Sequence, residues 1–179
     1  MLQIRIPEFE GWDDKNEVFV NKKAQNLTLE HSLVSISKWE AKYHKPFLSR
    51  DDKTEEETLD YVRFMTLTQN VDPDVYYRLT PDLIDKIKNY IDDPMTATTI
   101  NDKGKGSNRE IITSELVYYW MVSFNIPFEC QKWHFNRLIT LIRVCSIKNQ
   151  PQKKMSQSEI LSRNAALNAA RRKQLNTKG

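Results

Sequence analysis

The sequence is poor in glycine, cysteine and long apolar runs, and each shortage excludes a class of protein. With 4 Gly and 7 Pro in 179 residues, a collagen-like, linker-rich or turn-dense all-β chain is excluded. Two cysteines, Cys130 and Cys145, cannot form the disulfide framework of a small secreted domain, which favours a reducing compartment. The first residues lack the apolar segment of a signal peptide, and no stretch reaches the roughly 18 apolar residues of a membrane span. We therefore expect no membrane partner.

The apolar content, in contrast, is high enough for a packed core. Hydrophobic residues make up 39% of the chain, with 4 Trp, 7 Tyr and 7 Phe, which is too many for a disordered protein. A chain of this length buries roughly 70% of the surface that it exposes when unfolded. The sequence therefore predicts one sizeable domain, or one domain followed by an arm.

The net charge of +3 hides an uneven distribution along the chain. Residues 151–179 contain seven basic residues and one acidic residue, a net charge of +6, whereas residues 1–150 carry a net charge of −3. Charge asymmetry of this kind indicates an interaction tail. We therefore expect a core domain over residues 1–150 and a basic arm over residues 151–179.

The first twenty residues predict extended structure. Residues 2–6 alternate between apolar and polar side chains, the period of a half-buried strand, and Pro7 ends the run. Residues 17–20 predict a second short strand, while Gly11 and the polar residues 13–16 predict turns between the two. A loose N-terminal β-hairpin is the expected result.

The rest of the chain predicts helices. Apolar residues recur with helical spacing in five segments before the arm: 27–45, 55–67, 81–91, 115–124 and 128–147. Thr54 and Glu57 form a capping box for the second segment, and Thr80 followed by Pro81 suits the start of the third. The predicted fold class is mainly α, a helical domain of about five helices with a short N-terminal β-hairpin and a basic C-terminal helical arm.

One predicted helix, residues 115–124, has almost no polar face, because Leu116 to Val122 are all apolar or aromatic. Such a helix lies at the centre of a core, or its outer side contacts a partner. The sequence leaves both interpretations open.

No constellation of residues reaches the level of an enzyme signature, a metal site or a cofactor site. Cys130 and His134 could reach one metal ion from one helical face, but a structural zinc site needs four ligands and no second pair exists. The Lys-Gly-Lys-Gly-Ser run at 103–107 lacks the spacing of a phosphate-binding loop and reads as a solvated loop. We therefore expect a protein that is not an enzyme and that uses no cofactor.

The basic arm is the favoured partner-binding segment. Ser156 and Glu159 make a capping box for a helix that runs through an Ala-rich segment towards Leu175. Because residues 151–179 contain no aromatic residue to stack on bases, docking on a protein is favoured over binding nucleic acid. The alternative is that these basic residues bind no partner and are solvated residues that complement the helix dipole. The candidate partner-binding residues are Lys153, Lys154, Arg163, Leu167, Arg171, Arg172 and Lys173.

Four stretches of the sequence also resemble a family of small proteins encoded by tailed bacteriophages, of the tail assembly chaperone type. The resemblance covers nearly the whole chain, and the stretches that carry it are residues 29–48, 92–99, 109–145 and 163–172. The resemblance assigns no catalytic or ligand-binding residue. It implies a non-catalytic role, in which the protein holds the aggregation-prone tape-measure protein while tail tube subunits polymerise around it.

The same resemblance implies a location in the host cytoplasm during phage assembly, with retention in the virion as an open alternative. The expected partners are the tape-measure protein or another tail protein, together with self-association. The alternative functions are a structural virion component, such as a tail completion or connector protein, and less favourably a nucleic-acid-binding protein that acts through the arm.

Overall fold

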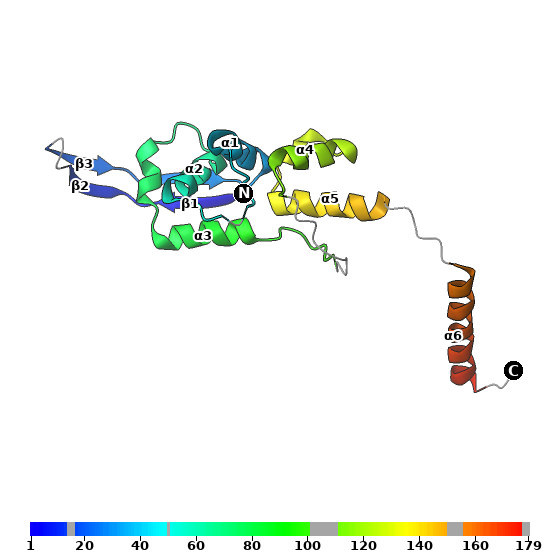
Figure 1. Ribbon diagram of the computed structural model, residues 1–179. Coiled ribbons are helices and arrows are strands. Elements are labelled where there is room, and N and C mark those ends of the chain that lie inside the picture. Colours follow the sequence, from blue (N-terminus) through cyan, green and yellow to red (C-terminus); the bar gives the residue numbers. More distant parts are fainter. Residues whose placement is uncertain (14–16, 50, 101–110, 150–155, 177–179) are drawn as a thin grey trace. The chain divides into compact units, whose positions relative to one another are not determined.

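The structure is a computed structural model of the chain, which describes residues 1–13, 17–49, 51–100, 111–149 and 156–176 (Figure 1). The chain divides into two compact units, Met1–Ser146 and Ile147–Gly179. The predicted boundary at residues 150 and 151 lies outside the described residues, a few positions from this division. The described residues are mainly helical with a small antiparallel β element at the N-terminus, as the sequence predicts.

The β element is a long two-stranded ribbon made of two consecutive ladders. Strand β1 (Leu2–Ile6) pairs with β4 (Gln25–Leu29), and β2 (Phe9–Asp13) pairs with β3 (Val18–Lys22), both antiparallel. The register continues from one ladder to the next, since Ile6 faces Gln25 and Phe9 faces Lys22. Pro7 interrupts the ladder because it has no N–H to donate.

The hairpin is confirmed, but the predicted partners within it are wrong. We expected β3 to pair with β1, but β3 pairs with β2. Strand β2 contains Gly11 and lies in a segment that we expected to form turns. The phenyl ring of Phe9 lies over Gly11, at a distance of 2.6 Å from where a Cβ would stand. Glycine is therefore the residue that lets this aromatic ring lie flat on the strand, and its turn propensity misled the prediction.

The helix predicted from Leu27 is also corrected, because it begins six residues later. Leu27 and Leu29 belong to β4 and are almost completely buried. Helix α1 (Leu33–Tyr43) begins only after Ser32, whose side chain caps it together with that of Ser35. Alternating buried leucines fit a strand as well as a helix over so few residues, and pairing with β1 decides between the two.

The remaining helices mostly follow the predicted segments. They are α2 (Glu55–Met65), α3 (Pro81–Asp92), α4 (Ser114–Ser123), α5 (Phe135–Asn149) and α6 (Gln157–Leu175), with short 3-10 helices η1 (Pro73–Arg78) and η2 (Phe128–Lys132). The five α-helices before α6 agree in number with the prediction for this part of the described chain. The capping boxes at Thr54 and Ser156 are confirmed.

The last predicted core helix is shorter than the sequence suggested. Cys130 lies in η2, and the α-helix begins only at Phe135, so Cys130 and His134 do not share a helical face. The amide of Trp133 closes the 3-10 turn on the carbonyl of Cys130, and the amide of Phe135 bonds to the carbonyl of His31 instead of to a residue of η2. These bonds separate the two helical segments.

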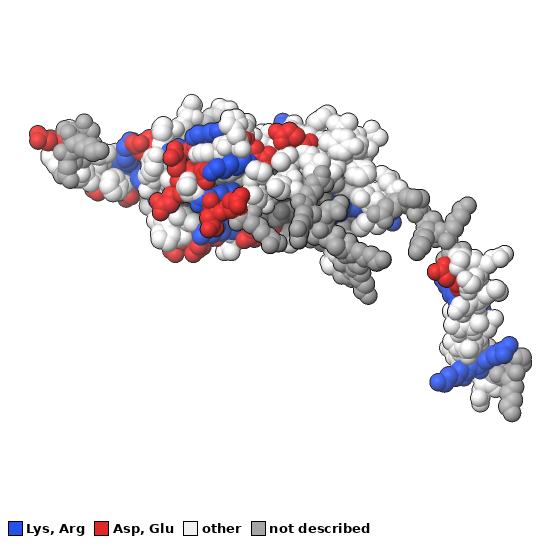
Figure 2. All heavy atoms as spheres, in the orientation of Figure 1, with Lys and Arg blue, Asp and Glu red and all other residues white. Residues whose placement is uncertain are grey.

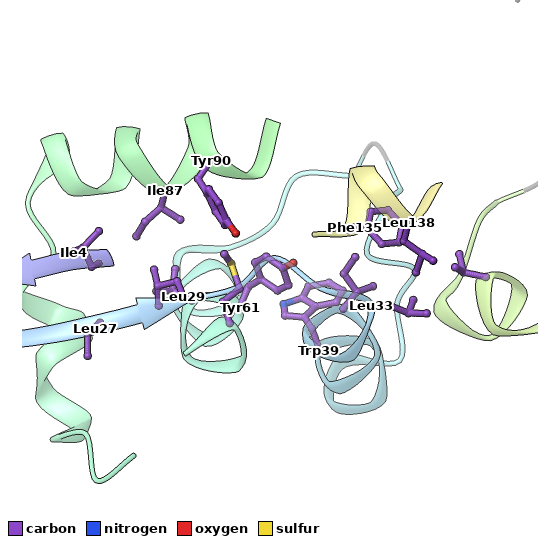
Figure 3. Close-up of a cluster of buried hydrophobic side chains, with 14 of the residues drawn as sticks. Ile4, Leu27, Leu29, Leu33, Trp39, Tyr61, Ile87, Tyr90, Phe135 and Leu138 are labelled. Carbon is purple, nitrogen blue, oxygen red and sulfur yellow. The ribbon is translucent and has the colours of Figure 1, made fainter. Parts of the chain in front are cut away.

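The core lies between the β1–β4 ladder and the helices around it (Figure 3). Leu29, Leu33 and Trp39 are no more than 1% exposed, and each belongs to a strand or helix whose neighbours cover it. Ile87 and Tyr90 of α3 approach the same cluster, while Phe135 and Leu138 bring the start of α5 to it. The buried hydrophobic residues extend from Ile4 to Ile142, all within the first unit.

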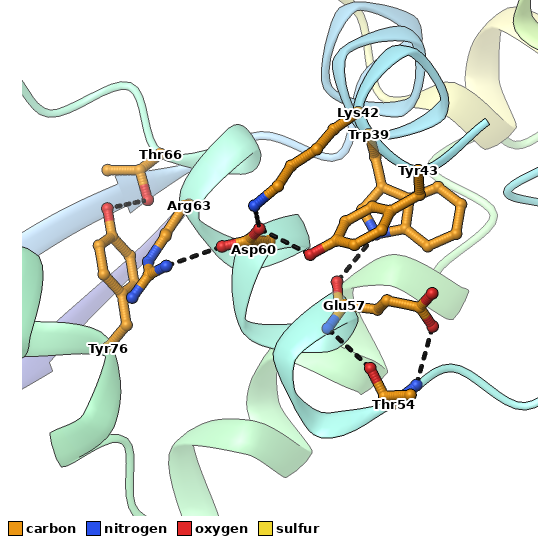
Figure 4. Close-up of polar contacts among 9 residues, drawn as sticks. All are labelled: Trp39, Lys42, Tyr43, Thr54, Glu57, Asp60, Arg63, Thr66 and Tyr76. Atoms are coloured by element: carbon orange, nitrogen blue, oxygen red, sulfur yellow. Dashed lines mark hydrogen bonds and ion pairs between the residues drawn. The ribbon is translucent and has the colours of Figure 1, made fainter. Parts of the chain in front are cut away.

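Polar contacts fix α1 against α2 (Figure 4). The buried carboxylate of Asp60 accepts hydrogen bonds from Lys42, from the Tyr43 hydroxyl at 2.7 Å and from Arg63 at 2.7 Å. The indole N–H of Trp39 donates to the carbonyl of Glu57 at 2.8 Å. Because each of these groups has a partner, the two helices can pack without leaving a buried charge unpaired.

Candidate functional site

The predicted partner-binding residues of the arm are placed only in part. Lys153 and Lys154 lie outside the described residues, as does the run at 103–107. The other five candidates, Arg163, Leu167, Arg171, Arg172 and Lys173, all lie on α6, whose C-terminal end carries a group of basic side chains in Figure 2. No residue of α6 is buried. Their role in partner binding stays a prediction.

The apolar residues of α6 do not form a continuous face. Ile160 and Leu161 are adjacent, so they point about 100° apart, and only Leu167 lies near the direction of Ile160. A helix that docks in a groove normally presents apolar residues at positions i, i+3, i+4 and i+7. This spacing is absent from α6, so an apolar docking surface must be sought elsewhere.

Helix α4 supplies such a surface, because it lies at the edge of the core. Its buried hydrophobic residues are Val117 and Met121, one turn apart, whereas Tyr119 is 65% exposed and Val122 is 58% exposed. Of the two interpretations of this apolar helix, the structure excludes the one that places it at the centre of the core. Its outer side exposes Tyr119 and Val122 together with the polar residues Glu115 and Ser123, and the surface over α4 in Figure 2 is mostly uncharged.

A cavity of about 300 Å³ lies between α4 and α5. We call it the α4–α5 groove, and it is lined by Ile112, Trp120, Phe124, Ile139, Ile142, Arg143 and Ser146. On α4 the lining residues are four positions apart, and on α5 they follow the spacing i, i+3, i+4, i+7. Each set therefore lies on one face of its helix.

The α4–α5 groove combines apolar walls with one positive charge. Trp120 and Phe124 are partly buried aromatic residues that pack against the core with their inner edges. The guanidinium of Arg143 forms no ion pair with any described carboxylate. This arrangement fits a helical segment of a partner whose apolar side chains enter the groove and whose neighbouring acidic residue contacts Arg143.

Buried Glu40 holds the start of α4 in place and thereby positions this wall of the groove. Its carboxylate accepts a hydrogen bond from the amide of Ser114 at 2.7 Å and another from the amide of Phe47 at 2.8 Å. Ser114 is the first residue of α4, where a negative charge also complements the helix dipole. The Thr113 hydroxyl caps the same turn by accepting from the amide of Leu116.

The sequence indicated one wall of the α4–α5 groove and missed the other. The apolar character of 115–124 pointed to an exposed helix as one of two interpretations. The α5 wall was hidden because Ile139, Ile142 and Arg143 look like an ordinary amphipathic face. The signal that the sequence contains for this wall is limited to the pair Ile139 and Ile142, because the other two residues at this spacing, Arg143 and Ser146, are polar.

The remaining chemistry of the described residues is modest. No group of three His, Cys, Asp or Glu side chains among them is arranged to hold a metal ion. Burial, together with the nearby Glu129 carboxylate, raises the pKa of the Cys130 thiol, which disfavours the reactive thiolate. None of the helices in this part of the chain combines the length and apolar content needed to cross a membrane.

The chain matches no protein-family model, no curated protein and no solved structure. Its function must therefore be inferred from its own residues.

Proposed function

We propose that this protein is a non-catalytic assembly chaperone of a tailed bacteriophage, which binds the tape-measure protein through the α4–α5 groove. The observation that carries the proposal is the α4–α5 groove, a cavity between two helices that is lined mainly by apolar residues. The sequence resemblance to tail assembly chaperones supports the identity of the client.

The physical basis is helix-in-groove recognition. A long helical client exposes apolar side chains until its assembly partners cover them, and a groove of matching polarity keeps these side chains out of water. Trp120 and Phe124 supply the aromatic wall on the α4 side of the groove. Arg143 provides a contact for an acidic residue of the client, which sets orientation more than affinity.

Co-expression with the tape-measure protein of the same phage genome tests the proposal. The wild-type chain is expected to keep the client soluble and to co-purify with it. Ser146→Glu places a charge in the lining of the α4–α5 groove and should reduce co-purification about tenfold or more. Leu67→Glu is the control, since Leu67 is 53% exposed in the same unit but does not line the groove.

Either of two results would contradict the proposal. The client could remain insoluble with the wild-type chain, or both variants could retain it equally. Mass spectrometry of purified particles separates a chaperone from the alternative, a structural virion component. A chaperone is expected to be absent, whereas a component would be present in stoichiometric amounts.

A further inference from the structure

We propose that two copies of this chain pair antiparallel through the open edge of β3, about a two-fold axis at Val20, to form one continuous sheet. This inference is independent of the function proposed for the α4–α5 groove. It concerns the ladder of β2 and β3, which we call the outer ladder and which projects from the helices of the first unit (Figure 1).

The first observation is that the outer ladder is apolar on both faces and buries neither of them. Trp12 and Phe19 face each other across the ladder and are 60% and 64% exposed. Phe9 and Val18 lie on the opposite face, because side chains alternate along a strand, and they are 50% and 49% exposed. A ladder of two strands is marginally stable in water unless a further strand or layer covers it. The outer ladder therefore has the composition of an incomplete sheet.

The second observation is that the two edges of the outer ladder differ. Among the described residues β2 and β3 pair only with each other, so each strand leaves backbone N–H and C=O groups open along one edge. Strand β3 begins with Val18, Phe19 and Val20, which have high strand propensity and no charge. Strand β2 has Gly11 at its centre and Glu10 beside it, and both residue types weaken pairing at an edge. The edge of β3 is therefore the one suited to a further strand.

Pairing of β3 with itself brings the exposed aromatic rings together. When Val20 faces Val20 of the second copy, Phe19 faces Asn21 of that copy and lies diagonal to its Phe19, within reach of an aromatic ring. Trp12 lies beside Phe19 on the same face, so the rings of both copies form one apolar belt. Self-pairing of β2 about Gly11 would instead place the two Glu10 carboxylates on this diagonal, where like charges repel.

Charges at the two ends of β3 complement each other in the same register. Glu17 directly precedes β3 and Lys23 directly follows it, so each lies opposite the other residue of the second copy. Symmetry repeats this contact at both ends of the paired strands. Neither residue forms an ion pair with another described residue, whereas Lys22 is held by Asp72 at 2.8 Å. This complementarity favours a second copy as the occupant of the edge over an unrelated strand.

The paired strands are short, so we expect a reversible dimer. Strand β3 has five residues, and an interface of this size lies below the roughly 1,200 Å² that stable complexes bury. A dissociation constant on the order of tens of micromolar is expected for such a contact.

Sedimentation velocity of the full chain, between about 5 and 500 µM, tests the proposal. The wild-type chain is expected to change from monomer to dimer over this range. Glu17→Lys places a lysine opposite Lys23 of the second copy and should weaken dimerisation about tenfold, as should Lys23→Glu. The double variant Glu17→Lys/Lys23→Glu exchanges the two charges and should restore dimerisation to near the wild-type level.

The control is Glu10→Lys, which makes the same change of charge at an exposed position of β2. It should leave dimerisation unchanged, because Glu10 does not lie at the edge of β3. A chain that stays monomeric at every concentration overturns the proposal and leaves this edge to a strand of another protein. Equal weakening by Glu10→Lys and Glu17→Lys, or a double variant that dimerises no better than the single variants, overturns it as well.

Discussion

At the scale of single residues, Asp60 shows how a buried charge contributes to stability. Burial by itself would raise the pKa of its carboxyl, but hydrogen bonds from Lys42, Tyr43 and Arg63 outweigh burial and lower the pKa below 3.8. We expect Asp60→Asn to reduce the free energy of unfolding by about 2 kcal/mol at neutral pH, because a charge-assisted contact to each cation is lost. Chemical denaturation measures this change.

The pH dependence of stability provides the control for Asp60. A carboxyl whose pKa is lowered by folding contributes stability above its ordinary pKa and loses that contribution as pH falls through the lowered value. The wild-type protein should therefore lose stability below about pH 4 more steeply than Asp60→Asn. Parallel curves for the two proteins would show that the Asp60 contacts contribute nothing.

His31 leads to a second prediction, at a higher pH. Its buried ring contacts Tyr61 and His134, and burial followed by the charge of His134 lowers its pKa from 6.5 to about 3. Below pH 6.5 the unfolded chain takes up a proton that the folded chain does not, so stability falls by up to about 1.4 kcal/mol per pH unit. Measurements of the unfolding free energy between about pH 6 and 5 should give a smaller slope against pH in His31→Gln, because unfolding of this variant takes up about one proton fewer. An unchanged slope would contradict the assignment.

At the scale of elements, α2 and α3 form a matched pair for the effect of capping. Both begin after an exposed threonine, but only Thr54 accepts a hydrogen bond, from the amide of Glu57 at 3.2 Å, whereas Thr80 makes no capping bond. We expect Thr54→Ala to cost about 1 kcal/mol of unfolding free energy and Thr80→Ala only a few tenths. Thermal or chemical denaturation of the two variants measures the difference. Equal costs would mean that intrinsic propensity, not the bond, explains the preference for threonine.

The capping pair also shows what local sequence could predict. The Thr54 and Ser156 boxes were recognised because all their parts lie within four residues. The absence of a bond from Thr80 could not be predicted, since Pro81 takes the first helical position and leaves free the amides of the second and third positions, which a cap side chain bonds. Long-range pairing was harder still: β4 was read as helix because its burial depends on β1, more than twenty residues away.

The candidate site was predictable to a similar, limited extent. The composition of 115–124 indicated an apolar helix that either fills the core or contacts a partner, and only the packing of Val117 and Met121 distinguishes the two. The packing of the start of α5 beside α1 and α3 had no signal in the sequence. It depends on the antiparallel bridge between Ser32 and His134 and on the hydrogen bond between His134 and the carbonyl of Tyr90.

At the scale of the whole molecule, the charge asymmetry coincides with a difference in packing. The acidic part of the sequence contains every buried hydrophobic residue of the described core, from Ile4 to Ile142. The basic part contains α6, which has no buried residue and no continuous apolar face. The stability of the first unit should therefore depend little on the basic arm.

A truncated chain that ends at Asn149 tests this independence. It keeps α5 to its last residue and removes the residues that contribute a net charge of +6. We expect its free energy of unfolding to lie within about 0.5 kcal/mol of that of the full chain. The slope of this free energy against denaturant concentration should also be unchanged, because it follows the surface exposed on unfolding. Binding of the tape-measure protein should persist if the α4–α5 groove is the docking site, and only its salt dependence should decrease, because the basic arm contributes long-range attraction. A large loss of stability would show instead that the arm is part of the folded core.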